Sequence, residues 1–177
     1  TATGNMTVQG SPSGAGTGSV TISTGTGGTQ KFTLNGGLTV QSLAGGNSAA
    51  TATVSADAGQ TIAAKFVDVL ANGAGNASIK NVTSGTQSIT TSGMDPSNRG
   101  VAVISAAGAG RSAKIDSTGT ATQTLTVNNA DNVAVIAGAG IAQITSSNNQ
   151  TIDIKGATSN NNLIVGGNAF GLCCSHK

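Results

Sequence analysis

The feature that most constrains the fold of this chain is an internal repeat of about thirty residues. A short phrase that begins with glutamine and continues with alternating apolar residues returns five times, at Gln30, Gln60, Gln87, Gln123 and Gln150. A second phrase of small residues around a glycine returns independently, at Gly16, Gly46, Gly75, Gly110, Gly140 and Gly167. A fixed step of this length is typical of stacked repeat architectures.

Both phrases lengthen at the same place, between Gln87 and Gln123, where the glutamine step grows from 27 to 36 residues. The extra residues match the segment Met94–Gly100, which contains Asp, Pro, Ser, Asn and Gly. Such residues favour turns. We therefore predict one inserted loop in an otherwise regular stack.

Between the two phrases, apolar residues alternate with polar or small ones, which predicts short strands. Each repeat holds three of them, and glycine interrupts every window that is long enough for a helix. The predicted fold is all-β and without helices: a three-sided parallel β-helix, or β-solenoid, of about six rungs of roughly thirty residues. It forms one domain over residues 1–177, with imperfect repeats at 5–29, 30–59, 60–86, 87–122, 123–149 and 150–172 and a tail at 173–177.

The repeat marks two sets of structural residues. The glycines of the second phrase are expected at corners, and Asn35-Gly36 and Asn72-Gly73 at corners that need a positive φ. Equivalent glutamines one rung apart predict a ladder of amide-to-amide hydrogen bonds. The alternative is a solvated corner glutamine that begins each strand.

Composition excludes several classes of function. Charged residues make up 8% of the chain and aromatic residues 2%, and the net charge is +2, against about 25% charged residues in a typical domain. No cluster of Lys or Arg with interleaved aromatic residues is present, which argues against nucleic-acid binding. No apolar stretch is long enough for a membrane-spanning helix. Low charge and abundant Ser, Thr and Asn favour an extracellular or cell-surface protein.

No motif points to an enzyme or to a cofactor. The glycine-rich runs lack the strand–helix context of a nucleotide-binding loop. The six aspartates fall at different phases of the repeat, and although Asp131 and Asp153 fall on neighbouring rungs, no feature marks them as a carboxylate pair for glycoside hydrolysis. We therefore expect no catalytic site and no bound cofactor.

The C-terminal tail holds both cysteines and the single histidine: Cys173, Cys174 and His176. Adjacent cysteines rarely bond to each other, because their Cα atoms lie closer than a disulfide prefers. Three readings stay open: an ordinary tail, a disulfide from Cys173 or Cys174 to another chain, and a metal site formed by Cys173, Cys174 and His176.

The Gln-Thr-Ile and Ala-Gly-x-Gly phrases resemble those of two groups of bacterial surface proteins. The chain resembles the shafts of filamentous-haemagglutinin-like adhesins, which are rich in Gly, Asn and Thr. It also resembles curlin-like functional amyloid subunits, in which Gln and Asn recur at fixed positions of a short solenoid. The resemblance spans residues 5–172 and implies a structural or adhesive role in biofilm or attachment.

These observations favour a structural subunit of an extracellular filament. An uncapped solenoid presents unpaired strand edges at both ends, and head-to-tail contacts that do not close generate open filaments. The expected partner is then a second copy of the chain. The alternative is a fragment of a large secreted β-helical adhesin that binds host or surface ligands.

Overall fold

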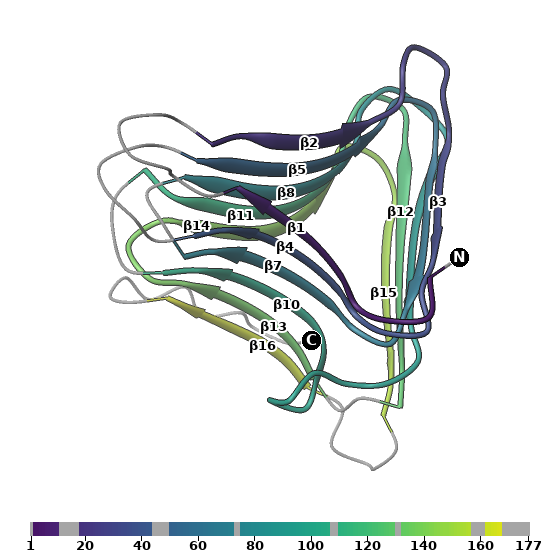
Figure 1. Cartoon of the computed structure of the whole chain (residues 1–177). Helices are drawn as coiled ribbons and strands as arrows, with labels where there is room; N and C mark the ends of the chain where they lie inside the picture. The colour runs from purple at the N-terminus through teal and green to yellow at the C-terminus, as the bar shows by residue number, and fades with distance from the viewer. Residues whose placement is uncertain are drawn as a thin grey trace.

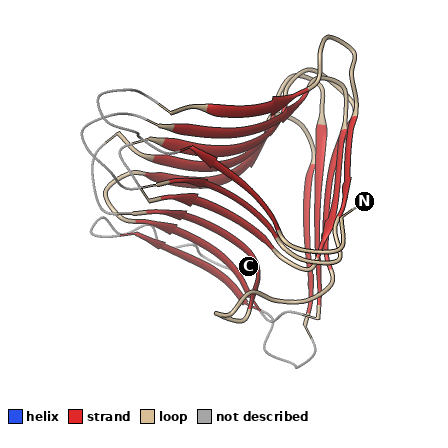
Figure 2. Ribbon diagram, viewed as in Figure 1, coloured by secondary structure: helices blue, strands red, loops and turns tan. Residues whose placement is uncertain are grey.

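The computed structural model describes residues 2–10, 18–43, 50–72, 75–106, 110–129, 132–156 and 162–167. Over these ranges the chain forms sixteen β-strands and no helix. Figure 2 shows the strands joined by loops at the corners of a triangular outline. The predicted three-sided β-solenoid is confirmed.

The strands form three parallel sheets, one on each side of the triangle (Figure 1). The first, sheet B, has the order β1 (Met6–Gly10), β4 (Leu38–Ser42), β7 (Val67–Ala71), β10 (Arg99–Ser105), β13 (Asn132–Ala137) and β16 (Asn162–Gly167). The second, sheet C, has the order β2 (Val20–Ser23), β5 (Thr51–Ala56), β8 (Asn76–Asn81), β11 (Ser112–Ser117) and β14 (Ile141–Ser146). The third, sheet D, has the order β3 (Gln30–Thr33), β6 (Gln60–Ala64), β9 (Thr86–Thr91), β12 (Thr122–Asn128) and β15 (Gln150–Lys155).

Each strand pairs with the strand three elements away, so the chain completes one turn every three strands. The described residues thus form five complete turns and the first strand of a sixth. The inserted loop lies where the sequence predicts it, between β9 and β10.

In-register pairing places like residues above one another. Ile79 of β8 pairs with Val54 on one side and Ile115 on the other, and Val69 of β7 pairs with Val40 and Val103. All six side chains are fully buried. Because strands in a sheet lie about 4.8 Å apart, the core consists of thin aliphatic columns that need no aromatic residue.

One expectation about the corners is wrong. Asn35, Gly36 and Asn72 do not have a positive φ, whereas Asn98 and Asn129 do. Glycine is needed at position 36 for a different reason, since a Cβ there would lie 2.4 Å from Oδ1 of Asn5. The corner is set by the close approach of two rungs and not by a left-handed turn. Gly73 lies outside the described residues.

The column arrangement generates a stability prediction. Ile89 of β9 points into the core and is 1% exposed, whereas its neighbour Thr90 points outward. Ile89→Ala should lower the free energy of unfolding by about 2–5 kcal/mol, because it removes buried methylene groups and leaves a cavity. Thr90→Ala should change it by less than about 0.5 kcal/mol. Urea unfolding followed by circular dichroism measures both, and equal losses would contradict the assigned facing of β9.

Candidate functional site: a buried glutamine ladder between two open ends

The five repeated glutamines lie in one column of sheet D and point into the solenoid. They pair in register from Gln30 through Gln60, Gln87 and Gln123 to Gln150. The three central members are at most 1% exposed. The glutamines occupy the alternate strand positions that face the core, as Gln60, Ile62 and Ala64 of β6 show.

The side-chain amides of this column form a continuous hydrogen-bonded ladder. Nε2 of Gln60 donates to Oε1 of Gln30 at 2.8 Å, Nε2 of Gln87 donates to Oε1 of Gln60 at 2.9 Å, and Nε2 of Gln123 donates to Oε1 of Gln87 at 2.7 Å. Nε2 of Gln150 donates to Oε1 of Gln123. The free-energy cost of removing the central amides from water is offset, because each amide forms hydrogen bonds with the glutamines on both neighbouring rungs.

The ladder also ties sheet D to sheet C. Nε2 of Gln123 lies 3.1 Å from the carbonyl oxygen of Thr145 and 3.4 Å from that of Ile115. Close by, the buried Asn81 accepts a hydrogen bond from N–H of Gly59 and donates one to the carbonyl of Ser84. One corner of the triangle is therefore a buried polar seam that holds two sheets together.

The ladder has a direction, because every Nε2 group donates toward the N-terminal end. Its last members therefore differ: Gln30 keeps an amide N–H group without a ladder partner, and Gln150 keeps a carbonyl oxygen. The two ends of the column are chemically complementary, as a donor and an acceptor.

The C-terminal end of the stack exposes residues of the core columns. Leu163 and Val165 of β16 continue the columns of Val133 and Val135 in register, yet they are 51% and 59% exposed. Beside them lies a mostly apolar hollow of about 300 Å³, which is also lined by Val135, Ala142, Ile144 and Ile152. Residues 168–177 follow this strand and lie outside the described residues.

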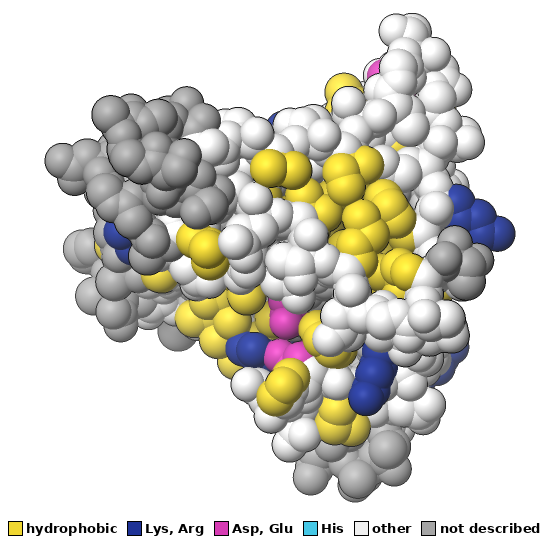
Figure 3. Space-filling view, in the orientation of Figure 1, with side chains coloured by type: hydrophobic (Ala, Val, Ile, Leu, Met, Phe, Trp, Pro, Cys, Tyr) yellow, Lys and Arg dark blue, Asp and Glu magenta, His cyan; other side chains and the backbone are white. Residues whose placement is uncertain are grey.

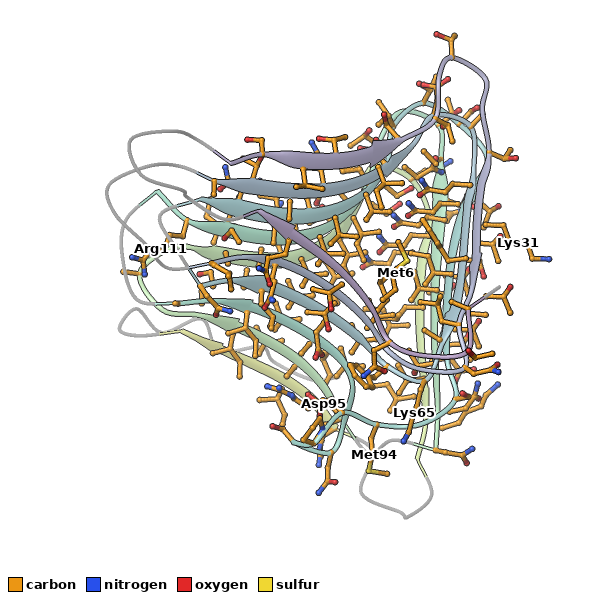
Figure 4. The ribbon with its side chains drawn as sticks, in the orientation of Figure 1. Met6, Lys31, Lys65, Met94, Asp95 and Arg111 are labelled. Atoms are coloured by element: carbon orange, nitrogen blue, oxygen red, sulfur yellow. The ribbon has the colours of Figure 1, made fainter. Side chains whose placement is uncertain are left out.

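The N-terminal end also presents core side chains. Met6, Ile22 and Phe32 are only partly buried against the core. Figure 4 shows Met6 pointing into the space between the sheets. In Figure 3, hydrophobic atoms gather in the same region. Both ends of the described stack thus expose apolar surface of the kind that its interior buries.

A charged cluster lies against the outer face of sheet B, below the apolar region in Figure 3. Asp95 of the inserted loop accepts hydrogen bonds from N–H of Ser97 and of Arg99 at 2.8 Å each, and its Oδ2 accepts from Nε and Nη2 of Arg99 at 2.8 and 2.6 Å. The loop covers Asp68 of β7, which is 8% exposed, and Oδ1 of Asp68 has no hydrogen-bond partner within the described residues. Burial is the main reason that the pKa of Asp68 is raised to about 6, and the negative charge of Asp95 raises it further. The positive charge of Arg99 acts in the opposite direction and lowers the pKa.

The other described aspartates each contact partners of their own. Asp57 accepts hydrogen bonds from the hydroxyl of Thr83 and from N–H of Gly27, which lower its pKa. Asp153 lies 2.9 Å from Nζ of Lys155, and Asp131 lies outside the described residues.

The predicted corner glycines are required for different reasons. Gly110 has a positive φ of 78°, whereas a Cβ at Gly75 or Gly140 would collide with a carbonyl oxygen of the preceding rung. Gly167 ends β16, while Gly16 and Gly46 lie outside the described residues.

The C-terminal residues Cys173, Cys174 and His176 also lie outside the described residues, so the inter-chain disulfide and the metal site stay predictions. No group of three metal-ligating side chains occurs in the described part of the chain.

The comparisons with known proteins return no relative. No family model, no curated protein and no solved structure matches the chain. Within the described ranges, no helix is long and apolar enough to span a membrane.

The ladder generates a prediction with a matched control. Gln87→Leu keeps the side-chain size but leaves Oε1 of Gln60 buried without a donor, so we expect a loss of about 1–3 kcal/mol in the free energy of unfolding. Gln41 of β4 donates to Gln9 at 2.7 Å in a similar pair that lies at the surface. Gln41→Leu should cost less than about 0.5 kcal/mol. Chemical unfolding of both variants tests this, and a neutral Gln87→Leu would contradict a stabilising role for the ladder.

The Asp68 cluster generates a pH prediction. Its folded pKa of about 6 lies above the ordinary value of 3.8, so the fold favours the protonated acid, and this contribution to stability is lost as the pH rises through about 6. Between pH 7.5 and pH 5 we expect a gain of about 1 kcal/mol in the free energy of unfolding from this group. Asp68→Asn should remove the gain.

Asp153→Asn is the control for that experiment, because Asp153 is partly exposed and ion-paired. It should leave the difference between the two pH values unchanged, as measured by urea unfolding. An unchanged pH dependence in Asp68→Asn would contradict the proposed environment of Asp68.

Proposed function

We propose that the protein is a structural subunit of an extracellular filament, formed by head-to-tail stacking of solenoids. The observation that carries the proposal is the exposure of core columns at the C-terminal end, where Leu163 and Val165 project from the last strand of sheet B. An exposed parallel strand edge with apolar inward side chains is a template for another strand. The low charge of the chain and its abundant Ser, Thr and Asn support an extracellular location.

The proposed junction pairs β16 of one copy with β1 of the next. Continued in register, the columns place Met6 of the next copy over Leu163 and its Val8 over Val165, because these residues share two columns within one chain. The contact is heterologous, since it joins two different edges, and it has no rotation that closes it into a ring. It therefore propagates as an open filament.

The strand count of the three sheets makes the junction more specific. Sheet B has six strands, whereas sheets C and D have five each. When β1 of the next copy is placed on β16, one strand position in each of sheets C and D is not filled by the described residues. Among the described residues, the glutamine ladder is then interrupted for one rung at each junction. Six strands at about 4.8 Å give an axial repeat of about 29 Å per subunit.

The proposal is tested by electron microscopy of purified protein together with two variants of β16. The wild-type protein should elongate into filaments with an axial repeat of about 29 Å. Val165→Asp should prevent elongation, because it places a charge in the column that the next copy covers. Ile164→Asp is the matched control: Ile164 is 43% exposed on the outer side of the same strand, and this variant should still elongate.

Two results would contradict the proposed function. One is wild-type protein that stays as monodisperse short particles at every concentration tested. The other is Val165→Asp protein that elongates as wild type does while circular dichroism shows an intact fold.

A further inference from the structure

The outer face of sheet C carries a groove that the proposed assembly does not use. It has a volume of about 380 Å³ and crosses the three strands β5, β8 and β11. This volume lies within the range of small-ligand sites. Since the groove is on the side of the sheet that faces away from the core, a ligand there does not compete with the stacking of rungs.

One part of the groove is a grid of neutral hydrogen-bonding side chains: Thr51, Thr53, Asn76, Ser78 and Ser112. Strand pairing sets their positions, because Thr51, Asn76 and Ser112 share one column and Thr53 and Ser78 share the next. The hydroxyl of Ser112 donates to Oδ1 of Asn76 at 2.7 Å. The amide NH₂ of Asn76 makes no hydrogen bond within the described residues. The grid therefore offers hydroxyl and amide groups to a ligand that is rich in hydroxyl groups.

The other part of the groove is charged and holds Lys80, Lys114 and Asp116. The two lysines occupy neighbouring strands one diagonal step apart, since Lys114 pairs with Ser78 and Lys80 pairs with Asp116. Strand geometry puts their Cβ atoms about 8 Å apart. Within the described residues neither ammonium group forms an ion pair with an aspartate.

Asp116 is turned toward the following strand. Its Oδ1 accepts a hydrogen bond from the hydroxyl of Thr145 at 2.6 Å and lies 3.5 Å from Nε2 of Gln143, both on β14. The groove thus has two cations without an ion-pair partner and one anion whose oxygen is already engaged. A ligand with separated negative charges and many hydroxyl groups complements this arrangement.

These features narrow the class of ligand. A polyphosphate or a nucleic acid carries a high density of charge, for which arginines and basic clusters are preferred, and Asp116 would repel it. A neutral glycan leaves both ammonium groups without a partner. A uronic-acid chain has one carboxylate on each sugar and hydroxyl groups on the remaining ring positions, so it supplies both kinds of partner.

We propose that the groove across β5, β8 and β11 binds a short stretch of a carboxylated polysaccharide built of uronic-acid units. The ammonium groups of Lys80 and Lys114 donate hydrogen bonds to the carboxylates, and the grid around Asn76 and Ser112 forms hydrogen bonds with the sugar hydroxyl groups. The site is shallow and has no aromatic platform, so a single groove binds weakly. The inference rests on the fold of one subunit and not on the proposed filament.

The test is a nuclear magnetic resonance titration of the unassembled, ¹⁵N-labelled protein, with light scattering used to verify that it stays monomeric. Hexagalacturonate is the ligand, and its methyl ester is the matched neutral ligand, since esterification removes the charges and keeps the sugar rings. Tripolyphosphate is the polyanion without sugar. We expect hexagalacturonate to shift amide signals of β5, β8 and β11, and at least tenfold weaker binding of the ester and of tripolyphosphate.

Two double variants with equal loss of charge complete the design. Lys80→Gln with Lys114→Gln should weaken hexagalacturonate binding at least tenfold. Lys31→Gln with Lys65→Gln removes two charges outside the groove: Lys31 lies in β3 of sheet D and points away from the core (Figure 4), and Lys65 follows β6. This control should change binding less than twofold. Lys80→Arg with Lys114→Arg keeps the charges and should retain binding within about threefold.

Four results would overturn the proposal. Equal binding of the methyl ester shows that the protein does not recognise the carboxylate groups. Equal binding of tripolyphosphate shows attraction of any polyanion. An equal loss in the Lys31 and Lys65 control, or signal shifts outside the three strands, shows that the groove is not the site.

Discussion

In-register stacking of each strand on the strand one turn earlier is the constraint on which the rest of this structure depends. Parallel pairing repeats each position of the chain at the strand spacing. A slip of one residue would turn the whole set of inward side chains of a strand to the solvent side. The core can therefore be built from Val, Ile, Leu and Ala, because each side chain packs on a similar one above and below. The same stacking brings backbone so close at Gly75 and Gly140 that a Cβ would collide with the preceding rung.

The glutamine ladder makes this register specific. Aliphatic columns tolerate small shifts, since one methyl group packs nearly as well as another, but a buried amide requires its partner at a fixed distance and angle. Each central glutamine is both a donor and an acceptor along the column, so a displaced rung leaves two polar groups without partners. The ladder also bonds to backbone carbonyl groups of sheet C at Ile115 and Thr145. Flat parallel sheets are commonly stabilised by such side-chain ladders.

The sequence predicted the architecture because its signals are local and repeated. The alternation of apolar and polar residues predicted the strands. The glutamine and glycine phrases, which recur with a common spacing of about thirty residues, predicted the stacked turns. The inward position of the glutamines was also open to prediction: Gln60 and Ile62 have the same parity, so a strand that buries Ile62 buries Gln60 as well. The parity of Gln with Ile or Leu recurs at Gln87 and Gln123, and it favours the ladder over the solvated corner.

Other features depend on contacts that the sequence does not encode locally. Asp68 occupies an outward position of β7, and its burial comes from a loop 27 residues later, at Asp95. The groove on sheet C joins residues of three turns, and its register requires the lengths of loops that differ from rung to rung. The expected left-handed corner at Asn35-Gly36 was wrong because a glycine phrase marks either a positive φ or a close approach of two backbones. Only the structure separates these two causes.

The two roles argued for the molecule use different surfaces and different chemistry. Stacking uses the ends, where core columns are exposed, and ligand binding uses an outer face with hydroxyl and ammonium groups. This separation follows from the architecture, because in-register stacking uses the inner positions and the strand edges and leaves the outer positions free to vary.

The stacked, inward-facing glutamine ladder is tested most directly by nuclear magnetic resonance of its side-chain amides. The account predicts nuclear Overhauser contacts between the Nε2 protons of Gln60, Gln87 and Gln123 on successive rungs, together with slow exchange of these protons with solvent. Rapidly exchanging side-chain amides without contacts between rungs would contradict it.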